Sequence, residues 1–337
     1  MKRFLAVFIL ICLTLSSCAA VKPEKSAADP VTVETTGLPA PEETETELAT
    51  ETETTAVTET ETETETETET EAVTEAPAKP KPKPMTEKVG TYTVYDPYNT
   101  RGLSEAHYGY GYGVAKDEKP HSVSQNNQKR FDSMKNVSAL ALDTKSKEKV
   151  IYLTFDCGYE YNNNTAKILD ILKKKNVSAA FFCTLSFIKN CPDTTRRMIN
   201  EGHIVGNHST THPVFPYISR TEMARELYGV DEHLKKNFGY ENKYFRFPTG
   251  GYSESSLELC TSLGYRSVFW SMAYSDWDTA NQMGHDKALE TVTSRIHPGA
   301  VILLHAVSDD NVSILSEFID YAQSKGYIFV TLDNYNW

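Results

Sequence analysis

Seven short runs of apolar and β-branched residues alternate with amphipathic segments between residues 149 and 337, and this alternation restricts the possible folds more than any other feature of the chain. Runs that are apolar on both faces are typical of parallel strands covered by helices. One intervening segment, residues 219–239, opens with the capping box of Ser219 and Glu222 and closes with Gly239, as helices do. The expected strands are residues 149–155, 178–183, 203–207, 243–248, 265–270, 300–305 and 327–332.

This pattern predicts an α/β fold with about seven parallel strands and six helices. A doubly wound open sheet and a barrel both fit it. No Gly-rich phosphate-binding loop follows the first strand, and an open sheet would gather its ligand groups at one switch point. Polar residues instead follow many different strands, as barrel active sites require. The sequence therefore favours a barrel formed by residues 149–337, rather than an open sheet.

The first 18 residues have the pattern of an export signal, in which Lys2 and Arg3 precede an apolar run and small residues. The run is short for a membrane span. "LSSC" (residues 15–18) resembles the lipobox of bacterial lipoproteins, which predicts lipidation of Cys18 and anchoring at the outer face of the cell membrane, towards the cell wall. An ordinary secretion signal with an incidental cysteine is the alternative.

Residues 19–86 are predicted to be a disordered tether, because "ETETETETETETE" and its surroundings offer few apolar groups and charge of one sign. Residues 31–78 hold 15 Glu and neither Lys nor Arg, and residues 1–30 sum to +2, so the net charge of −12 leaves +1 for residues 79–337. The part of the chain expected to fold is nearly neutral, and a nucleic-acid partner, which needs a basic face, is not expected.

Residues 87–148 contain many aromatics but little periodicity, and we interpret them as an irregular arm packed on the barrel. Their Tyr–Gly repeat could stack on sugar rings or simply pack. Cys183 and Cys191 are close enough in sequence to form a disulfide. Cys260 lies on the apolar side of an expected helix, so we predict that it is a buried free thiol.

Polar side chains stand at or just after the ends of five expected strands. Because the carboxyl ends of parallel strands in a barrel meet at one rim, we expect these side chains to face the same space. They are Asp156, His208 and His212, Arg246, Asp276 and Trp277, and His305.

The chemistry of these residues suggests roles for each. His208 and His212 are four residues apart, so in a helical turn both imidazoles would project to one side, which suits a divalent metal. Asp156 could be a general base that Arg246 keeps ionised; a turn cap and a rim salt bridge are the structural alternatives. His305 could be a neutral core histidine, or Asp276 could raise its pKa so that it acts as a general acid.

Together these residues resemble the polysaccharide deacetylases, the NodB-homology or carbohydrate esterase family four. The resemblance covers about residues 146–335 and rests on five motifs in order, "TFDCG", "HSTTH", "RFPTG", "SDW" and "ILLH". It implies a distorted (β/α) barrel, a divalent metal such as zinc, and hydrolysis of an N-acetyl group from an amino sugar. By motif position it implies Asp156 as base, Arg246 as its orienting residue, His305 as acid tuned by Asp276, His208 and His212 as metal ligands, the backbone N–H of Thr249 at the oxyanion, and Tyr159, Trp277 and Ile302 as substrate contacts.

Cys157 departs from the common family pattern, which has a second Asp there as third metal ligand. A Cys157 thiolate could complete a Cys-His₂ zinc set with the two histidines. It could also be a poor ligand, or mark a domain that has lost its metal and only binds glycan.

The "GYE" that follows Cys157, the "EGH-I-GNHS" run and the "HPGA--LLH-VS-DN" run are similar to the δ-lactam-forming muramic acid de-N-acetylases of spore cortex, which also lack the second Asp. This implies an enzyme that deacetylates N-acetylmuramic acid in peptidoglycan strands without stem peptides, leading to muramic δ-lactam. We expect the protein to be a monomer. A broader peptidoglycan or chitooligosaccharide deacetylase and a non-catalytic glycan-binding module are the alternatives.

Overall fold

The computed structural model describes residues 85–337, so the predicted signal, Cys18 and all but the last two residues of the predicted tether lie outside the described residues. Between residues 85 and 337, no helix has both the length and the hydropathy needed to cross a membrane.

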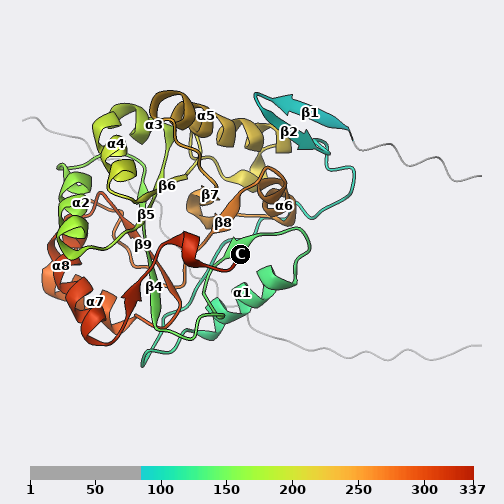
Figure 1. The fold of residues 1–337 in the computed structure, drawn as a ribbon. Coiled ribbons are helices and arrows are strands. Elements are labelled where there is room, and N and C mark those ends of the chain that lie inside the picture. The colour runs from blue at the N-terminus through green and yellow to red at the C-terminus, as the bar shows by residue number, and fades with distance from the viewer. Residues whose placement is uncertain (1–84) are drawn as a thin grey trace, which may run out of the picture. The chain divides into compact units, whose positions relative to one another are not determined.

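A curled sheet of parallel strands forms the centre of the fold (Figure 1). β9 pairs with β4 along its whole length, and a parallel bridge between Met272 and Ile302 connects the segment after β8 to β9. The sheet therefore curls back towards itself, which confirms the distorted barrel. The strands are β4 (Val150–Cys157), β5 (Ala180–Cys183), β6 (Ile204–Asn207), β7 (Tyr244–Phe245), β8 (Arg266–Val268), β9 (Ala300–His305) and β10 (Ile328–Phe329).

Helices surround this sheet, and neighbouring ones contact each other in the order α7, α8, α2, α4, α3, α5 and α6 (Figure 1). All six expected helices form, and the capping box of Ser219 and Glu222 is present at the start of α5. The short helix α3 was not expected from the sequence. Their bounds are α2 (Asn164–Lys175), α3 (Leu185–Asn190), α4 (Pro192–Asn200), α5 (Arg220–Phe238), α6 (Glu254–Ser262), α7 (His285–Ser294) and α8 (Asp309–Ser324).

The alternation of side chains along β4 decides which residues reach the interior of the barrel. Ile151, Leu153, Phe155 and Cys157 belong to the apolar core shared with the helices. The residues between them point the other way, so that Asp156 is directed into the barrel. The same alternation in β9 places Ile302 with the helices and directs Leu303 and His305 inward.

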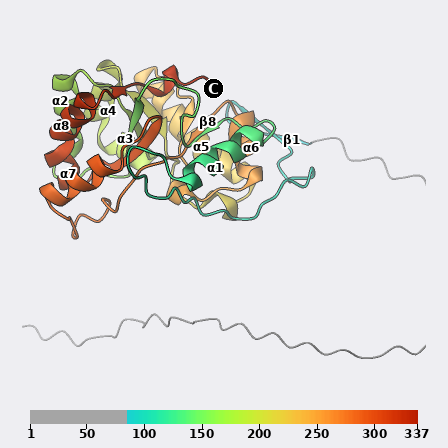
Figure 2. The same ribbon diagram turned by 90° about the horizontal axis from the view of Figure 1, so that it is seen from below.

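The N-terminal arm is more regular than its sequence suggests. It contains the hairpin of β1 (Thr86–Val89) and β2 (Tyr92–Tyr95), the helix α1 (Ser122–Ser133) and the strand β3 (Ala139–Leu140). β3 pairs in parallel with β8 and extends the barrel sheet, with α1 packed against it on the side of α6 (Figure 2). Residues 96–121, which include the Tyr–Gly repeat, contain no helix or strand apart from isolated bridges and pack irregularly, as expected. The hairpin, α1 and β3 were not anticipated, and β3 is stabilised by pairing with β8 rather than by a periodic pattern of its own.

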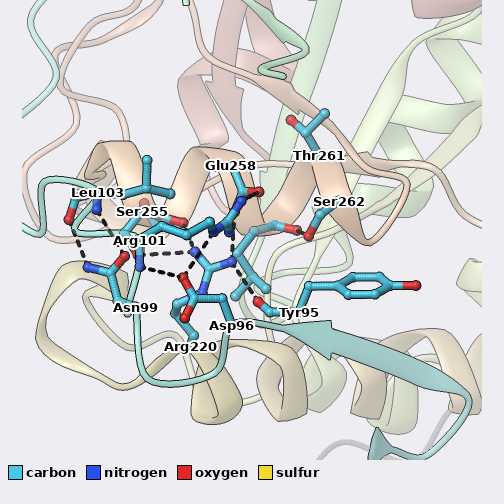
Figure 3. Close-up of polar contacts among 12 residues, drawn as sticks. Tyr95, Asp96, Asn99, Arg101, Leu103, Arg220, Ser255, Glu258, Thr261 and Ser262 are labelled. Carbon is cyan, nitrogen blue, oxygen red and sulfur yellow. Dashed lines mark hydrogen bonds and ion pairs between the residues drawn. The ribbon is translucent and has the colours of Figure 1, made fainter. Parts of the chain in front are cut away.

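Four alternating charges connect the arm to the barrel, and we call them the arm clasp (Figure 3). Arg101 joins Asp96 at 2.9 Å to Glu258 at 3.0 Å, and Glu258 also pairs with Arg220 at 2.7 Å. Arg220 is 1% exposed and donates a further hydrogen bond to the carbonyl of Tyr95. Because buried charges need both partners and hydrogen bonds, the clasp fixes the arm against α5 and α6.

Candidate active site

A cavity of about 850 Å³ opens at the carboxyl ends of the strands and receives most of the predicted site residues. Arg246 and Asp276 do not line it but contact residues that do. The predicted residues on its wall are Asp156, Tyr159, His208, His212, Thr249, Trp277 and His305. Tyr159 and Trp277 are the two aromatic residues among them, and their side chains are exposed, at 53% and 56%.

Asp156 and Arg246 form a buried ion pair on one wall of the cavity. The guanidinium donates to Oδ1 of Asp156 at 2.8 Å and to Thr154 at 2.8 Å, and Arg246 is entirely buried. Burial alone would raise the pKa of Asp156, but the charge of Arg246, aided by His208 and His305, outweighs it and lowers that pKa. The carboxylate is therefore ionised and held in one orientation.

His208 and His212 point their Nε2 atoms at the same space, 3.2 Å apart. The residues between them form a loop and not the helical turn that the spacing suggested, and positive φ angles at Ser209 (70°) and His212 (61°) bring the two rings together. Burial lowers the pKa of His208 to about 4, so this imidazole is neutral at neutral pH. Its Nδ1 lies 2.9 Å from the carbonyl of Arg246, which fixes the tautomer with the lone pair on Nε2.

This histidine pair fits a divalent metal. Two imidazole nitrogens bound to one tetrahedral zinc at about 2.0–2.1 Å would stand roughly 3.3 Å apart, close to the spacing observed. Oδ2 of Asp156 lies 3.6 Å from Nε2 of His208. Over residues 85–337, however, no group of three or more His, Cys, Asp or Glu side chains is arranged to hold an ion, so the described residues provide two ligands, His208 and His212, at this site.

The structure does not bring Cys157 to the two histidines, so the expected Cys-His₂ set is not formed. As the neighbour of Asp156 on β4, Cys157 faces the opposite side of the sheet, where it is fully buried in the core opposite Cys183. Burial and the neighbouring Cys183 raise the pKa of the Cys157 thiol well above its usual value. Cys157, Cys183, Cys191 and Cys260 are all free thiols, and the possible Cys183–Cys191 pair is not present.

His305 and Asp276 form a second hydrogen-bonded pair facing the same cavity. Nδ1 of His305 lies 2.7 Å from Oδ1 of Asp276, and the backbone N–H of His305 donates to Oδ2. Burial would lower the pKa of His305, but the hydrogen bond and charge of Asp276 raise it overall. Asn311 at the start of α8 donates a hydrogen bond to Asp276 at 2.6 Å. This contact was not predicted from the sequence, where the "DN" of residues 310–311 was the one feature that could have pointed to it.

Two other parts of the cavity wall differ from expectation. Ile302 is buried in the core and does not reach the cavity, whereas Leu303 lines it; the strand alternation that directs His305 inward requires this. Tyr112 of the arm also lines the cavity and donates to the carbonyl of Ala273 at 3.0 Å. Thr249 adopts a left-handed conformation with φ of 56° on the wall.

Comparison with known proteins matches residues 143–268 to the family model described as polysaccharide deacetylase. The chain is 44% identical over 190 residues to the peptidoglycan-N-acetylmuramic acid deacetylase PdaA of Bacillus subtilis, covering 56% of this chain and 72% of that protein. It is 33% identical over 186 residues to a peptidoglycan-N-acetylglucosamine deacetylase of Bacillus cereus, covering 54% and 66%.

The solved structure of Bacillus subtilis PdaA, described as a family 4 carbohydrate esterase, superposes with a TM-score of 0.64 at 38% identity, covering 69% of this chain and 97% of that one. A family 4 carbohydrate esterase from Bacillus anthracis superposes with a TM-score of 0.55 at 39% identity and the same coverage. Both alignments extend well beyond residues 143–268, and they agree with the curled sheet described above.

Proposed function

The chain belongs to the polysaccharide deacetylase family, whose members hydrolyse N-acetyl amide bonds, and we propose that it deacetylates N-acetylmuramic acid in peptidoglycan. The proposal rests on two hydrogen-bonded pairs of side chains at one cavity, Asp156 with Arg246 and His305 with Asp276. A glycan-binding module has no need of a carboxylate held ionised opposite an imidazole whose pKa is raised, whereas amide hydrolysis needs both a base and an acid.

In the proposed mechanism, the residues of the site divide the reaction between them. Asp156 takes a proton from water as the water oxygen forms a bond to the acetyl carbonyl carbon. Arg246 keeps the carboxylate of Asp156 oriented towards that water. The backbone N–H of Thr249 donates to the oxyanion that develops. His305 then gives its proton to the sugar nitrogen as the C–N bond breaks, so that acetate and a free amine leave.

A divalent metal held by His208 and His212, which we expect to be zinc, would supply Lewis-acid polarisation at this site. The neutral state of His208 and the shared direction of the two Nε2 atoms support this assignment.

The identity with PdaA supports muramic acid as the sugar. We propose that the natural substrate is glycan from which the stem peptide has been removed, because only then is the lactyl carboxyl free. The amine released by deacetylation could condense with that carboxyl, with loss of water, to give the muramic δ-lactam of spore cortex.

We further propose that the enzyme is exported and anchored by a lipid on Cys18. The charged and apolar pattern of residues 1–18 supports this. A tether of roughly 60 disordered residues would have a root-mean-square reach on the order of 40–45 Å, enough to place the barrel among the glycan strands. Replacing Cys18 with Ala should release the protein from the membrane fraction.

The test is acetate release by the full chain from peptide-free glycan containing muramic acid, after metal removal and again after zinc is restored. Release that requires zinc supports the proposal, and Asp156→Asn serves as the inactive control. Equal release from a chitooligosaccharide, which lacks muramic acid, would replace the proposal with a broader deacetylase. Release that persists without metal would remove the metal from the mechanism, and no release from either glycan would favour the binding module.

A further inference from the structure

The loop that carries both histidines is held in an unfavourable backbone conformation. Ser209 and His212 both have positive φ, which L-residues other than glycine rarely adopt. Such a conformation persists only where the surroundings determine it. Part of the support is internal to the loop, where the N–H of His212 donates to Oγ of Ser209 at 2.9 Å.

The rest of the support comes from α5, through the carboxylate of Glu226. Oε2 accepts the backbone N–H groups of Thr210 at 2.9 Å and Thr211 at 2.7 Å, and Oε1 accepts the Thr211 hydroxyl at 2.8 Å. The main-chain carbonyl of Glu226 also accepts the hydroxyl of Thr210. One residue of α5 therefore holds both residues at the tip of the loop.

Gly229, one helical turn further along α5, allows this approach. A Cβ at position 229 would stand 2.5 Å from Oγ1 of Thr210, closer than such atoms pack. Glycine inside a helix is unfavourable relative to alanine, so its presence here is explained by the loop lying directly on the helix.

We propose that Glu226 is a positioning residue of the metal site, which fixes the loop so that His208 and His212 face one ion. The inference rests on the metal role given to these histidines above. Glu226 touches neither imidazole and is assigned no part in the chemistry. Its effect is to hold the two ligands together before the metal arrives, as outer residues do in other metal sites, where their loss lowers metal affinity by about 10–100-fold.

The experiment measures the zinc dissociation constant of the metal-stripped full chain by competition with a chromophoric chelator. Glu226→Ala should weaken zinc binding by about 10–100-fold. Glu226→Gln keeps an acceptor oxygen for the two N–H groups and should bind nearly as tightly as wild type. The matched control is Glu232→Ala, because Glu232 lies on the same helix, is exposed, and accepts a hydrogen bond from Tyr228 on that helix rather than from the histidine loop.

Gly229→Ala is a second, independent variant, which should weaken zinc binding by displacing Thr210 while favouring the helix itself. It also decides the question if Glu226→Ala does not fold. Thermal unfolding of each metal-free variant separates a loss of affinity from a loss of structure.

Wild-type affinity in both Glu226→Ala and Gly229→Ala would overturn the proposal, provided that His212→Ala loses zinc. Equal losses in Glu226→Gln and Glu226→Ala would overturn it in favour of a purely electrostatic role for the carboxylate. A wild-type chain that binds no zinc would overturn the metal site itself, and this result is distinguishable because it appears before any substitution at Glu226.

Discussion

The two walls of the cavity place their charged groups in different surroundings. On one wall, Arg246 is wholly buried and donates to Asp156, to Thr154 and to backbone carbonyls. On the other, the side chain of His305 is 24% exposed, with buried Asp276 behind it. The first wall holds the Asp156 carboxylate in one orientation. The second wall leaves the His305 imidazole accessible to substrate and solvent. In the proposed mechanism, this difference suits a base that must be ionised before it accepts a proton and an acid that must be protonated before it donates one.

The largest effect should come from the buried wall. Asp156→Asn keeps an acceptor for Arg246 but cannot take a proton, so deacetylation should fall by roughly 10²–10⁴-fold. Steady-state acetate release measures this, and cooperative thermal unfolding checks that the fold is retained. Activity close to wild type would show that the base is another group.

A smaller effect, visible mainly in the pH profile, should come from the exposed wall. Asp276→Asn removes the charge that raises the pKa of His305, so the alkaline limb of the rate profile should move to lower pH. An unmoved limb would separate His305 from the acid step.

The same substitution has a consequence for stability. The pKa of His305 is raised in the folded protein, so the interaction of Asp276 with protonated His305 stabilises the fold. This stabilisation is complete at pH values below the unfolded histidine pKa of about 6.5. It is lost as the pH rises through the pKa of His305 in the folded protein. The difference in unfolding free energy between wild type and Asp276→Asn should therefore shrink at alkaline pH. Denaturant unfolding at several pH values measures it, and a difference that grows with pH would contradict the direction of the shift.

Asn311→Ala tests whether the second wall depends on support from α8. Asp276 would lose a buried hydrogen bond to a charged group, which contributes roughly 1.5–3 kcal/mol to unfolding free energy. Because Asp276 keeps its charge but loses a donor that stabilises it, the carboxylate should hold the His305 proton more strongly. We therefore expect a modest loss of rate and a shift of the alkaline limb to higher pH, opposite to that of Asp276→Asn. A loss of stability without any shift would limit Asn311 to a structural role.

The smallest effect on activity should come from Cys157→Ser. The thiol faces the helices and not the cavity, so zinc affinity and acetate release should stay close to wild type. The buried hydroxyl should instead lower stability by about 1–3 kcal/mol. A large loss of zinc affinity would return Cys157 to the ligand set and contradict the strand orientation described here.

The sequence predicted the parts of this molecule that follow a repeating pattern. All seven strands of residues 149–337, the helices between them and the capping box of α5 formed as expected, because periodicity and capping are local signals. The gathering of Asp156, His208 and His305 also followed, since parallel strands bring their carboxyl ends together.

What the sequence missed depends on side-chain direction and distant contacts. Ile302 and Cys157 were placed by motif position, although each is one residue away from an inward-facing neighbour on its strand. The histidine loop was expected to be helical, and its support by Glu226 arises from a helix that begins eight residues after His212. Strand β3 exists because β8 pairs with it, and two residues carry no periodic signal.

The arm clasp bears on where this protein can be divided. A fragment that began at residue 143, where the family match starts, would leave Arg220 and Glu258 without Arg101, uncover the edge of β8, and remove Tyr112 from the cavity wall. Grafting the barrel onto a foreign N-terminal segment would have the same result. The segment that must be kept whole in a truncation or a domain exchange is therefore longer than the catalytic motifs indicate. It begins at the hairpin that starts at Thr86.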